Sequence, residues 1–298
     1  MLKFYTLELS HRIAMAPMTR KRATEDSIPR PYMAEYFAQR ASTPGTLLTT
    51  DGTIIAFRAG GYPHVPGIWN QDQIDGWKPV TAAVHAKKSF IFMQLWALGR
   101  AGPREFCEGP SAIPITGADT PRALTEDEIH EYISFFAQAA KNAIEAGFDG
   151  VELHGANGYL IDQFLRESSN TRTDAWGGTI EKRAHFGLEV AAAVVAAIGA
   201  ERTAVRMSPF ADWQDMSMEG AAEQFGYYVT ELKKLKLAYL HIFEEFEKDK
   251  LRFLVEIWDN TSPVLICGEY TAELAYAAVD KEFRDYDVVV VFGFVLLP

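Results

Sequence analysis

Residues 148–159 form the stretch FDGVELHGANGY, which decides how this chain is expected to fold. Its first half, residues 148–153, is a short apolar run of the kind that forms a buried strand. An imidazole, an amide and a phenol follow at once, at His154, Asn157 and Tyr159. In a barrel enzyme, catalytic side chains lie where a strand ends and the turn into the next helix begins. A phenol at that place is suited to protonate carbon, while the imidazole and the amide hold a carbonyl oxygen on which negative charge develops.

Similar apolar runs occur along the whole chain and alternate with longer amphipathic segments. The predicted strands are residues 12–18, 45–55, 89–96, 149–154, 202–208, 237–243, 262–267 and 287–293. The predicted helices are residues 74–88, 125–146, 180–198, 221–235 and 272–283. Thr125 and Glu128 have the spacing of a capping box, and Gly147 is suited to end the helix that they open.

This alternation predicts an α/β fold of the (β/α)8 TIM-barrel type, with residues 1–298 in a single domain. A chain of 298 residues that is 48% hydrophobic is long enough for one such core. A doubly wound sheet is disfavoured because the sequence contains no GxGxxG turn.

Composition restricts the class of partner. The formal net charge of −11 disfavours nucleic acid or an anionic membrane surface, since both favour a basic face. Cys107 and Cys267 stand far apart, so neither a disulfide framework nor a zinc site is expected, and we expect no metal. The N-terminus lacks a signal-peptide pattern and the apolar runs are too short to span a membrane, so a cytoplasmic protein is expected.

Other strand ends also carry candidate residues, each with a simpler structural explanation. Gly52 would let a flat ligand approach the backbone, or it could be a bulge glycine. The amide of Gln94 could bind a ring edge with both a donor and an acceptor. Arg206 lies in a buried strand, where a guanidinium needs an anion, either a ligand or a structural carboxylate. His154 alone would fit a satisfied core histidine, whereas His154, Asn157 and Tyr159 together favour function.

The chain resembles the old yellow enzyme family of FMN-dependent ene-reductases, in its fungal and plant-like branch. The resemblance covers nearly the whole chain and is most specific in the last of four stretches: HRIAMAPMTRKRA (11–23), HVPGIWNQDQIDGWKPVTAAVHAK (64–87), FMQLWALGRAG (92–102) and FDGVELHGANGYLIDQFLRESSNTRTDAWGGTIEKRAHF (148–186).

The resemblance implies a barrel that holds FMN at the carboxyl ends of its strands and takes NADPH as reductant. His154 and Asn157 would hold the substrate carbonyl, Tyr159 would donate the proton, and Trp96 would shape the substrate pocket. The residues implied to contact FMN are Pro17, Met18, Thr19, Gly52, Gln94, Arg206, Gly268 and Gly293. The substrate would be a small enone or enal, such as a fungal secondary metabolite, and the oligomeric state is left open.

The chain departs from the family in length and at the phosphate-binding end. Sequence is expected to be missing before residue 4, within 98–120, near 244–250 and after 293. Glu269 and Phe294 stand where the family has a neutral donor and an arginine. Losing a bidentate arginine would weaken FMN binding by roughly 10- to 1000-fold. Either the shortening belongs to the protein, or segments are left out of the sequence and Gly293 and Phe294 are not true neighbours.

Two enzymatic functions remain open on this basis. The first is the FMN-dependent reduction of an α,β-unsaturated carbonyl compound. The second is a flavin-independent isomerase or cyclase, in which His154 and Asn157 hold an oxyanion and Tyr159 acts as the acid. A non-catalytic binding protein is disfavoured because it would not require the proton donor.

Overall fold

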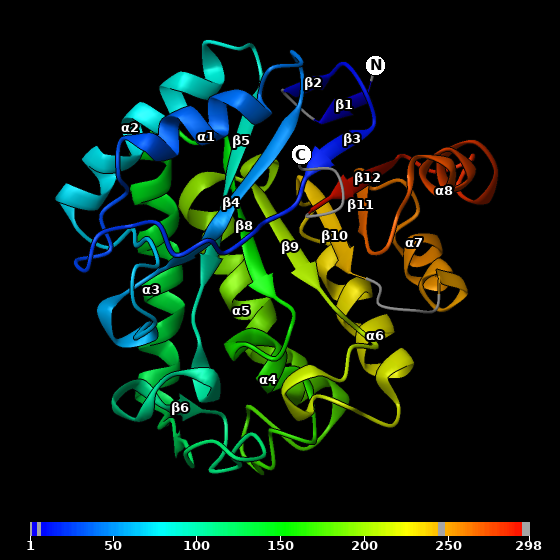
Figure 1. The fold of residues 1–298 in the computed structure, drawn as a ribbon. Helices are drawn as coiled ribbons and strands as arrows, with labels where there is room; N and C mark the ends of the chain where they lie inside the picture. Colours follow the sequence, from blue (N-terminus) through cyan, green and yellow to red (C-terminus); the bar gives the residue numbers. More distant parts are fainter. Residues whose placement is uncertain (1, 5–6, 244–247, 294–298) are drawn as a thin grey trace.

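The computed structural model describes residues 2–4, 7–243 and 248–293. Eight parallel strands close into a barrel in which each strand pairs with the next along the chain, and β12 pairs with β3 (Figure 1). The barrel strands are β3 (Ile13–Met15), β4 (Leu47–Ile54), β5 (Phe90–Trp96), β8 (Gly150–Gly155), β9 (Thr203–Met207), β10 (Tyr239–Phe243), β11 (Val264–Cys267) and β12 (Val288–Phe292). All eight predicted strands and the predicted (β/α)8 fold are confirmed.

Helices surround the barrel on its outer side (Figure 1). They are α1 (Tyr32–Arg40), α2 (Gln71–His85), α3 (Glu126–Glu145), α4 (Leu160–Leu165), α5 (Ile180–Ile198), α6 (Ala221–Lys233), α7 (Arg252–Trp258) and α8 (Ala272–Ala277). The capping box at Thr125 and Glu128 is present, and Gly147 follows α3 with φ +90°. The predicted helix 272–283 is interrupted, because α8 ends at Ala277 and a π-helical turn, Ala278–Glu282, continues the chain.

Two layers of packing hold this architecture together. Apolar side chains between the strands and the helices form the larger core, and a second cluster fills the inside of the barrel. Within the barrel, Phe92 lies so close to Gly150 that a Cβ there would be 2.4 Å from its ring. Glycine at 150 is therefore required by packing, since real Cβ contacts are never this short. Nearer the carboxyl ends of the strands the interior becomes polar, with Gln94, Glu152 and His241 fully buried or nearly so.

The amino-terminal end of the barrel is closed by a hairpin of β1 (Leu2–Phe4) and β2 (Leu7–Leu9). Leu9 is completely buried and belongs to the cluster that fills the barrel interior. In Figure 1 this hairpin lies at one end of the molecule, and the arrows of β8 and β9 point toward the other. Any site for a ligand that enters the barrel must therefore open at the carboxyl ends of the strands.

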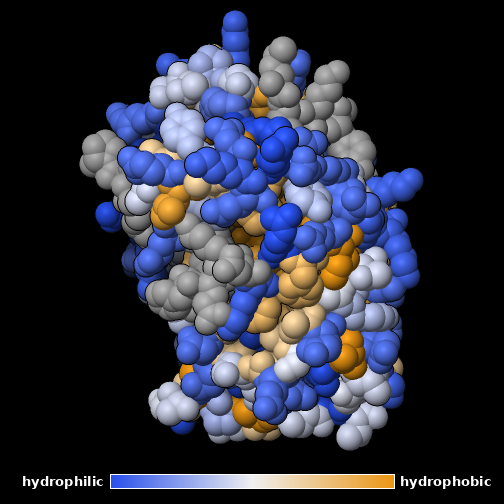
Figure 2. Space-filling model, turned by 90° about the vertical axis from the view of Figure 1, so that its right-hand side faces the viewer, coloured by the Kyte–Doolittle hydropathy of each residue, from blue (hydrophilic) through white to orange (hydrophobic). Residues whose placement is uncertain are grey.

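The side of the molecule that carries β12 and α8 is less well covered. Figure 2 shows a band of apolar atoms between hydrophilic flanks on this side. Ile13 of β3 is 48% exposed, although it lies on a barrel strand. Ile13 and Phe292 both line two cavities, of about 420 and 340 Å³, along β3, β12 and α8. Within the described residues, the outer face of these two strands is thus only partly covered by helices.

Candidate active site at the carboxyl ends of the strands

The turn after β8 is held in a defined conformation by the neighbouring strand end. Asn157 has φ +59°, a left-handed backbone conformation that asparagine tolerates better than most residues. Its backbone N–H donates to Ser208 Oγ at 2.8 Å, and its carbonyl accepts from Gln214 Nε2 at 2.7 Å. The loop that follows β9 therefore fixes how the turn presents the Asn157 amide.

Three rings pack together at the carboxyl ends of β5 and β8. The Trp96 ring lies 6.0 Å from His154 in a stacked arrangement and 4.8 Å from Tyr159 in an edge-on arrangement. His154 and Tyr159 are also adjacent, with ring centroids 5.0 Å apart. The structure thus brings the predicted carbonyl holder, proton donor and pocket residue into contact.

Burial sets the protonation state of both polar rings. Desolvation, followed by the positive charge of Arg206, lowers the pKa of His154 well below 6.5. The imidazole is therefore neutral at pH 7 and can donate a hydrogen bond without losing its proton to solvent. Burial, followed by the neighbouring Tyr62, raises the pKa of Tyr159 to about 12, so its phenol stays protonated. The site thus holds a neutral donor and a weak acid side by side.

A buried carboxylate organises the layer immediately below these rings. Glu152 accepts hydrogen bonds from Gln94 Nε2 at 2.8 Å, Tyr239 Oη at 3.0 Å and His241 Nδ1 at 2.8 Å. Although burial opposes it, the hydrogen bond from His241, the positive charge of Arg206 and the hydrogen bond from Gln94 lower the pKa of Glu152 below 4.5, so it is anionic. Burial lowers the pKa of His241 below 6.5, so the pair is a carboxylate with a neutral imidazole. We call these four residues the Glu152 cluster.

The Glu152 cluster restricts the orientation of Gln94. Because the Gln94 amide nitrogen is bound to Glu152, its carbonyl oxygen is left to accept from a ligand. Arg206 lies level with His154 on one side and His241 on the other in the strand register. No described carboxylate lies within ion-pair distance of its guanidinium, which is 5.4 Å from the Phe243 ring. The alternative that Arg206 serves a direct structural ion pair therefore has no support in the described residues.

The other predicted flavin contacts lie on the same rim. Met18 is buried and lies next to Gly293, whose added Cβ would be 3.8 Å from the Met18 sulfur. Pro17 is partly exposed and Thr19 exposed in the loop after β3, and Gly268 is partly exposed after β11.

The bulge that was the simpler explanation for Gly52 is present, and the positions at the phosphate-binding end stay predictions. The close approach at Gly52 is made by Trp96, since a Cβ there would lie 2.6 Å from the indole, and β4 has a bulge between Thr49 and Gly52. Glu269 is exposed, and Phe294 lies outside the described residues.

Several buried polar atoms at this rim have no hydrogen-bond partner among the described residues. They are Trp96 Nε1, His154 Nδ1, Asn157 Oδ1, Arg206 Nε and Gln214 Oε1. Each buried polar group left unpaired costs about 1–3 kcal/mol, so a group of five in one place is costly unless a polar ligand pairs with them. Donors and acceptors together suit a flat ligand with carbonyl oxygens and ring nitrogens, which is the chemistry of a flavin and of a carbonyl substrate. The residues present therefore fit both groups.

Sequence reasoning missed the residues that support the turn after β8. Asp162 and Arg166 form a buried ion pair at 2.8 Å, and Asp162 also accepts from the N–H of Gly158 at 2.9 Å. Arg166 donates to the carbonyls of Ser208 at 2.6 Å and Met216 at 2.5 Å. This pair therefore joins α4 to the loop that holds Asn157. The i,i+4 spacing of Asp162 and Arg166 was the available signal, but an exposed helical pair has the same spacing.

Within the described ranges, no three His, Cys, Asp or Glu side chains are arranged to hold a metal ion. None of the described helices combines the length and apolar character that crossing a bilayer requires.

Comparison with known proteins gives matches over nearly the whole chain. A family model described as the NADH:flavin oxidoreductase / NADH oxidase family matches residues 2–285. The chain is 49% identical to a chanoclavine-I aldehyde reductase of Penicillium roqueforti, over 96% of this chain and 82% of the relative. It is 46% identical to a protein of Epichloe festucae var. lolii named as a probable inactive reductase, over 98% of this chain and 83% of that one. A solved old yellow enzyme homologue from Zymomonas mobilis has a TM-score of 0.91 and 37% identity, over 98% of this chain and 87% of the other.

Proposed function

This chain belongs to the NADH:flavin oxidoreductase / NADH oxidase family, and from that membership we propose that it reduces the activated C=C bond of an α,β-unsaturated carbonyl compound. The match confirms the resemblance to old yellow enzymes, so the protein is an NADH- or NADPH-dependent oxidoreductase. The name of the aldehyde reductase from Penicillium roqueforti supports an aldehyde, and we propose that the substrate is a small enal or enone. The observation that carries the proposal is the convergence of His154, Asn157 and Tyr159 on a rim with unpaired polar atoms.

FMN, when bound, supplies the hydride for the β-carbon of the alkene, and NADPH is the proposed reductant. We propose that the Gln94 carbonyl and the Arg206 guanidinium bind the polar edge of the flavin ring. The rim residues Pro17, Met18, Thr19, Gly52, Gly268 and Gly293 would line it. The anionic Glu152 holds the Gln94 amide, so that this side chain is oriented before any ligand arrives.

The residues proposed to face the substrate hold its carbonyl oxygen and supply the proton. The neutral imidazole of His154 and the amide of Asn157 donate to the substrate carbonyl oxygen, which draws electron density from the C=C bond. Arg206 stabilises negative charge that accumulates nearby, as its effect on the pKa of His154 indicates. Tyr159, held protonated by its raised pKa of about 12, then delivers a proton to the α-carbon. Trp96 packs against His154 and Tyr159, and so fixes the distance between oxygen holder and proton donor.

The test replaces the phenol without disturbing the ring packing. Tyr159→Phe should lower the rate of product formation by about 10²- to 10⁴-fold, as expected for loss of a general acid, with substrate affinity little changed. Tyr227→Phe on α6, away from the rim, is the matched control and should keep full activity. Unchanged turnover in Tyr159→Phe would remove Tyr159 as the proton donor.

NADPH consumption and the visible spectrum of the purified protein distinguish the reductase from the isomerase or cyclase. A reductase consumes one NADPH for each alkene reduced, and the protein should carry a bound chromophore that absorbs visible light and bleaches with NADPH under anaerobic conditions. Substrate conversion by a colourless protein, without NADPH and without any gain of flavin on reconstitution, would refute the reductase and favour the isomerase or cyclase.

A further inference from the structure

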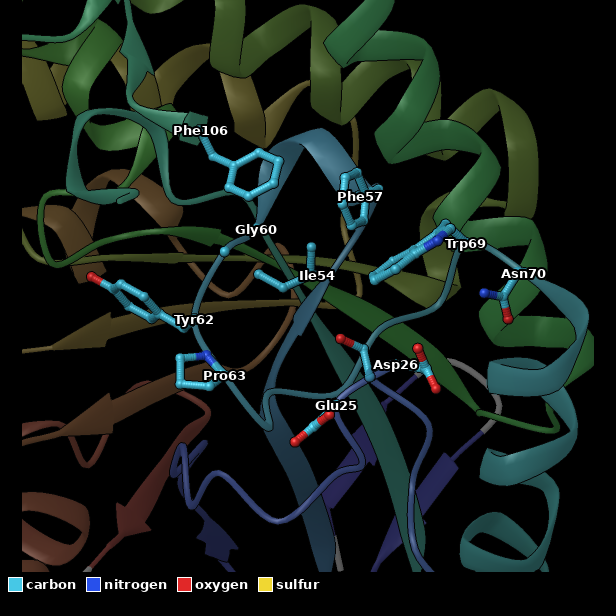
Figure 3. Close-up of a pocket in the computed structure, with 12 residues that line it drawn as sticks. Glu25, Asp26, Ile54, Phe57, Gly60, Tyr62, Pro63, Trp69, Asn70 and Phe106 are labelled. Carbon is cyan, nitrogen blue, oxygen red and sulfur yellow. The ribbon is translucent and has the colours of Figure 1, made fainter. Parts of the chain in front are cut away.

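Another cavity, of about 400 Å³, lies beside the barrel mouth and outside the residues proposed for catalysis. It is formed by the loops that follow β3 and β4 and by the chain that leads into α2, with one residue from the loop after β5 (Figure 3). Four aromatic side chains and two carboxylates dominate its lining: Phe57, Tyr62, Trp69, Phe106, Glu25 and Asp26. Its volume lies within the range of small-molecule sites, about 300–1,000 Å³.

The aromatic walls are fixed by their own packing. The ring centroids of Phe57 and Phe106 are 5.2 Å apart at an interplanar angle of 89°. The Trp69 ring lies directly on Gly67, where a Cβ would be 2.1 Å from it, and the Trp69 backbone N–H donates to Gln73 Oε1 at 2.8 Å. Trp69 and the Phe57–Phe106 pair are therefore held by contacts within the lining, which limits the ordering of side chains needed on binding.

The charge in the cavity is negative and is not balanced by its own lining. Neither Glu25 nor Asp26 forms an ion pair or a side-chain hydrogen bond with any described residue, and no basic side chain lines the cavity. Arg58, which follows Phe57, is already bound to three carboxylates of its own: Glu108, Glu128 and Glu131. In Figure 3, Glu25 and Asp26 lie along one side of the cavity, opposite Phe57 and Phe106.

We propose that this cavity binds an organic ammonium ion, with its cationic nitrogen between the carboxylates and the aromatic faces. Aromatic faces attract cations through the ring quadrupole, and the effect is largest for tryptophan. Two unpaired carboxylates add direct charge attraction and disfavour an anionic ligand. The apolar rings also suit an aryl group attached to the ammonium.

The proposed cation site goes beyond the proposed reductase activity and does not depend on it. Tyr62 separates the two sites: its ring lines the cavity and lies 5.8 Å from Trp96, while its hydroxyl donates to the carbonyl of Ala101 at 2.8 Å. Binding at the cation site can therefore be measured whether or not the protein turns over substrate.

The test measures binding of phenethylammonium to the full-length protein by calorimetry, with 2-phenylethanol as the uncharged analogue of similar shape. Phenethylammonium should bind in a saturable way, more weakly as salt is raised, and more tightly than the alcohol. The double variant E25Q/D26N should bind it about 3- to 25-fold more weakly, the range expected for two exposed charges. Trp69→Leu should weaken binding about 2- to 5-fold through loss of the cation–π contact.

The matched control is Glu8→Gln, which removes one exposed carboxylate from β2 at the opposite end of the barrel. It should leave the affinity for phenethylammonium unchanged, and circular dichroism should show that all variants are folded. The proposal is overturned if 2-phenylethanol binds as tightly as phenethylammonium, or if E25Q/D26N and Trp69→Leu both bind phenethylammonium like the unmodified protein.

Discussion

Glu152→Gln is predicted to destabilise the barrel strongly while changing the side chain's shape very little. The Glu152 carboxylate is completely buried and accepts from Gln94, Tyr239 and His241. A glutamine keeps the oxygen that faces one of these donors, but it places an NH2 group where the other oxygen accepted from two donors. It also removes the negative charge that faces Arg206 inside the barrel.

The magnitude follows from these losses. Hydrogen bonds to a charged group contribute about 1.5–3 kcal/mol each, and the two bonds that Glu152 Oε2 accepts lose their charged acceptor. His241 can shift its proton to Nε2, which currently has no partner, and then accept from the new amide at Nδ1. Tyr239 can accept from the new amide only by turning its own O–H away, and it then loses its bond to an anion, so we expect a net loss of about 2–4 kcal/mol in the free energy of unfolding.

Urea titration of the purified protein, followed by tryptophan fluorescence and circular dichroism, measures this quantity. A double-mutant cycle with Tyr239→Phe should give a coupling of at least about 1 kcal/mol, because both changes affect the same hydrogen bond. A loss below about 1 kcal/mol for Glu152→Gln, at an unchanged m-value, would refute the view that this carboxylate organises the interior.

The remaining predictions concern other buried polar groups. Arg166→Met should lower the free energy of unfolding by about 3–5 kcal/mol, because it leaves the buried Asp162 carboxylate without its partner. The double variant Arg166→Met/Asp162→Asn should regain part of this loss in urea titrations. Losses of the two single variants that simply add in the double variant would contradict the prediction. Stability should also fall on acidification below pH 6.5. The folded pKa values of His154 and His241 are lowered, so the unfolded chain binds more protons there, and together they remove up to about 2 kcal/mol between pH 6.5 and 5.5. His85 acts in the opposite direction: the hydrogen bond to Asp149 raises its pKa, so protonated His85 stabilises the fold below pH 6.5. A melting temperature that rises from pH 7 to 5.5 would contradict the prediction that His154 and His241 are neutral in the folded protein.

The fold was largely predictable because its signals are local. Each barrel strand is a short apolar run, and α5 has the predicted bounds at both ends because Thr179 caps it and Gly199 ends it. The helices that were missed are those with weak signals. α1 starts after Pro31 without a side-chain cap and buries only Met33 and Phe37, and α7 is only seven residues long.

The candidate site was predictable only where its residues lie close together in sequence. His154, Asn157 and Tyr159 belong to one turn, so their convergence could be expected from spacing. The Glu152 cluster could not, because Glu152 and His241 are 89 residues apart and meet only when β8 and β10 take their places in the barrel. A buried glutamate is also rare enough that its position in an apolar run points to a partner without naming it.

The hairpin that closes the amino-terminal end has a consequence for kinetics. Leu9 fills the amino-terminal end of the barrel, and apolar side chains pack above it. In the described part of the barrel, a ligand can therefore enter only at the carboxyl ends of the strands. If the proposed reductant and the proposed substrate both bind beside Trp96 and Tyr159, the first must leave before the second can bind. Double-reciprocal plots of the steady-state rate against one reactant, at several concentrations of the other, should then give parallel lines. An excess of either reactant should inhibit the enzyme, because it occupies the site that the other needs.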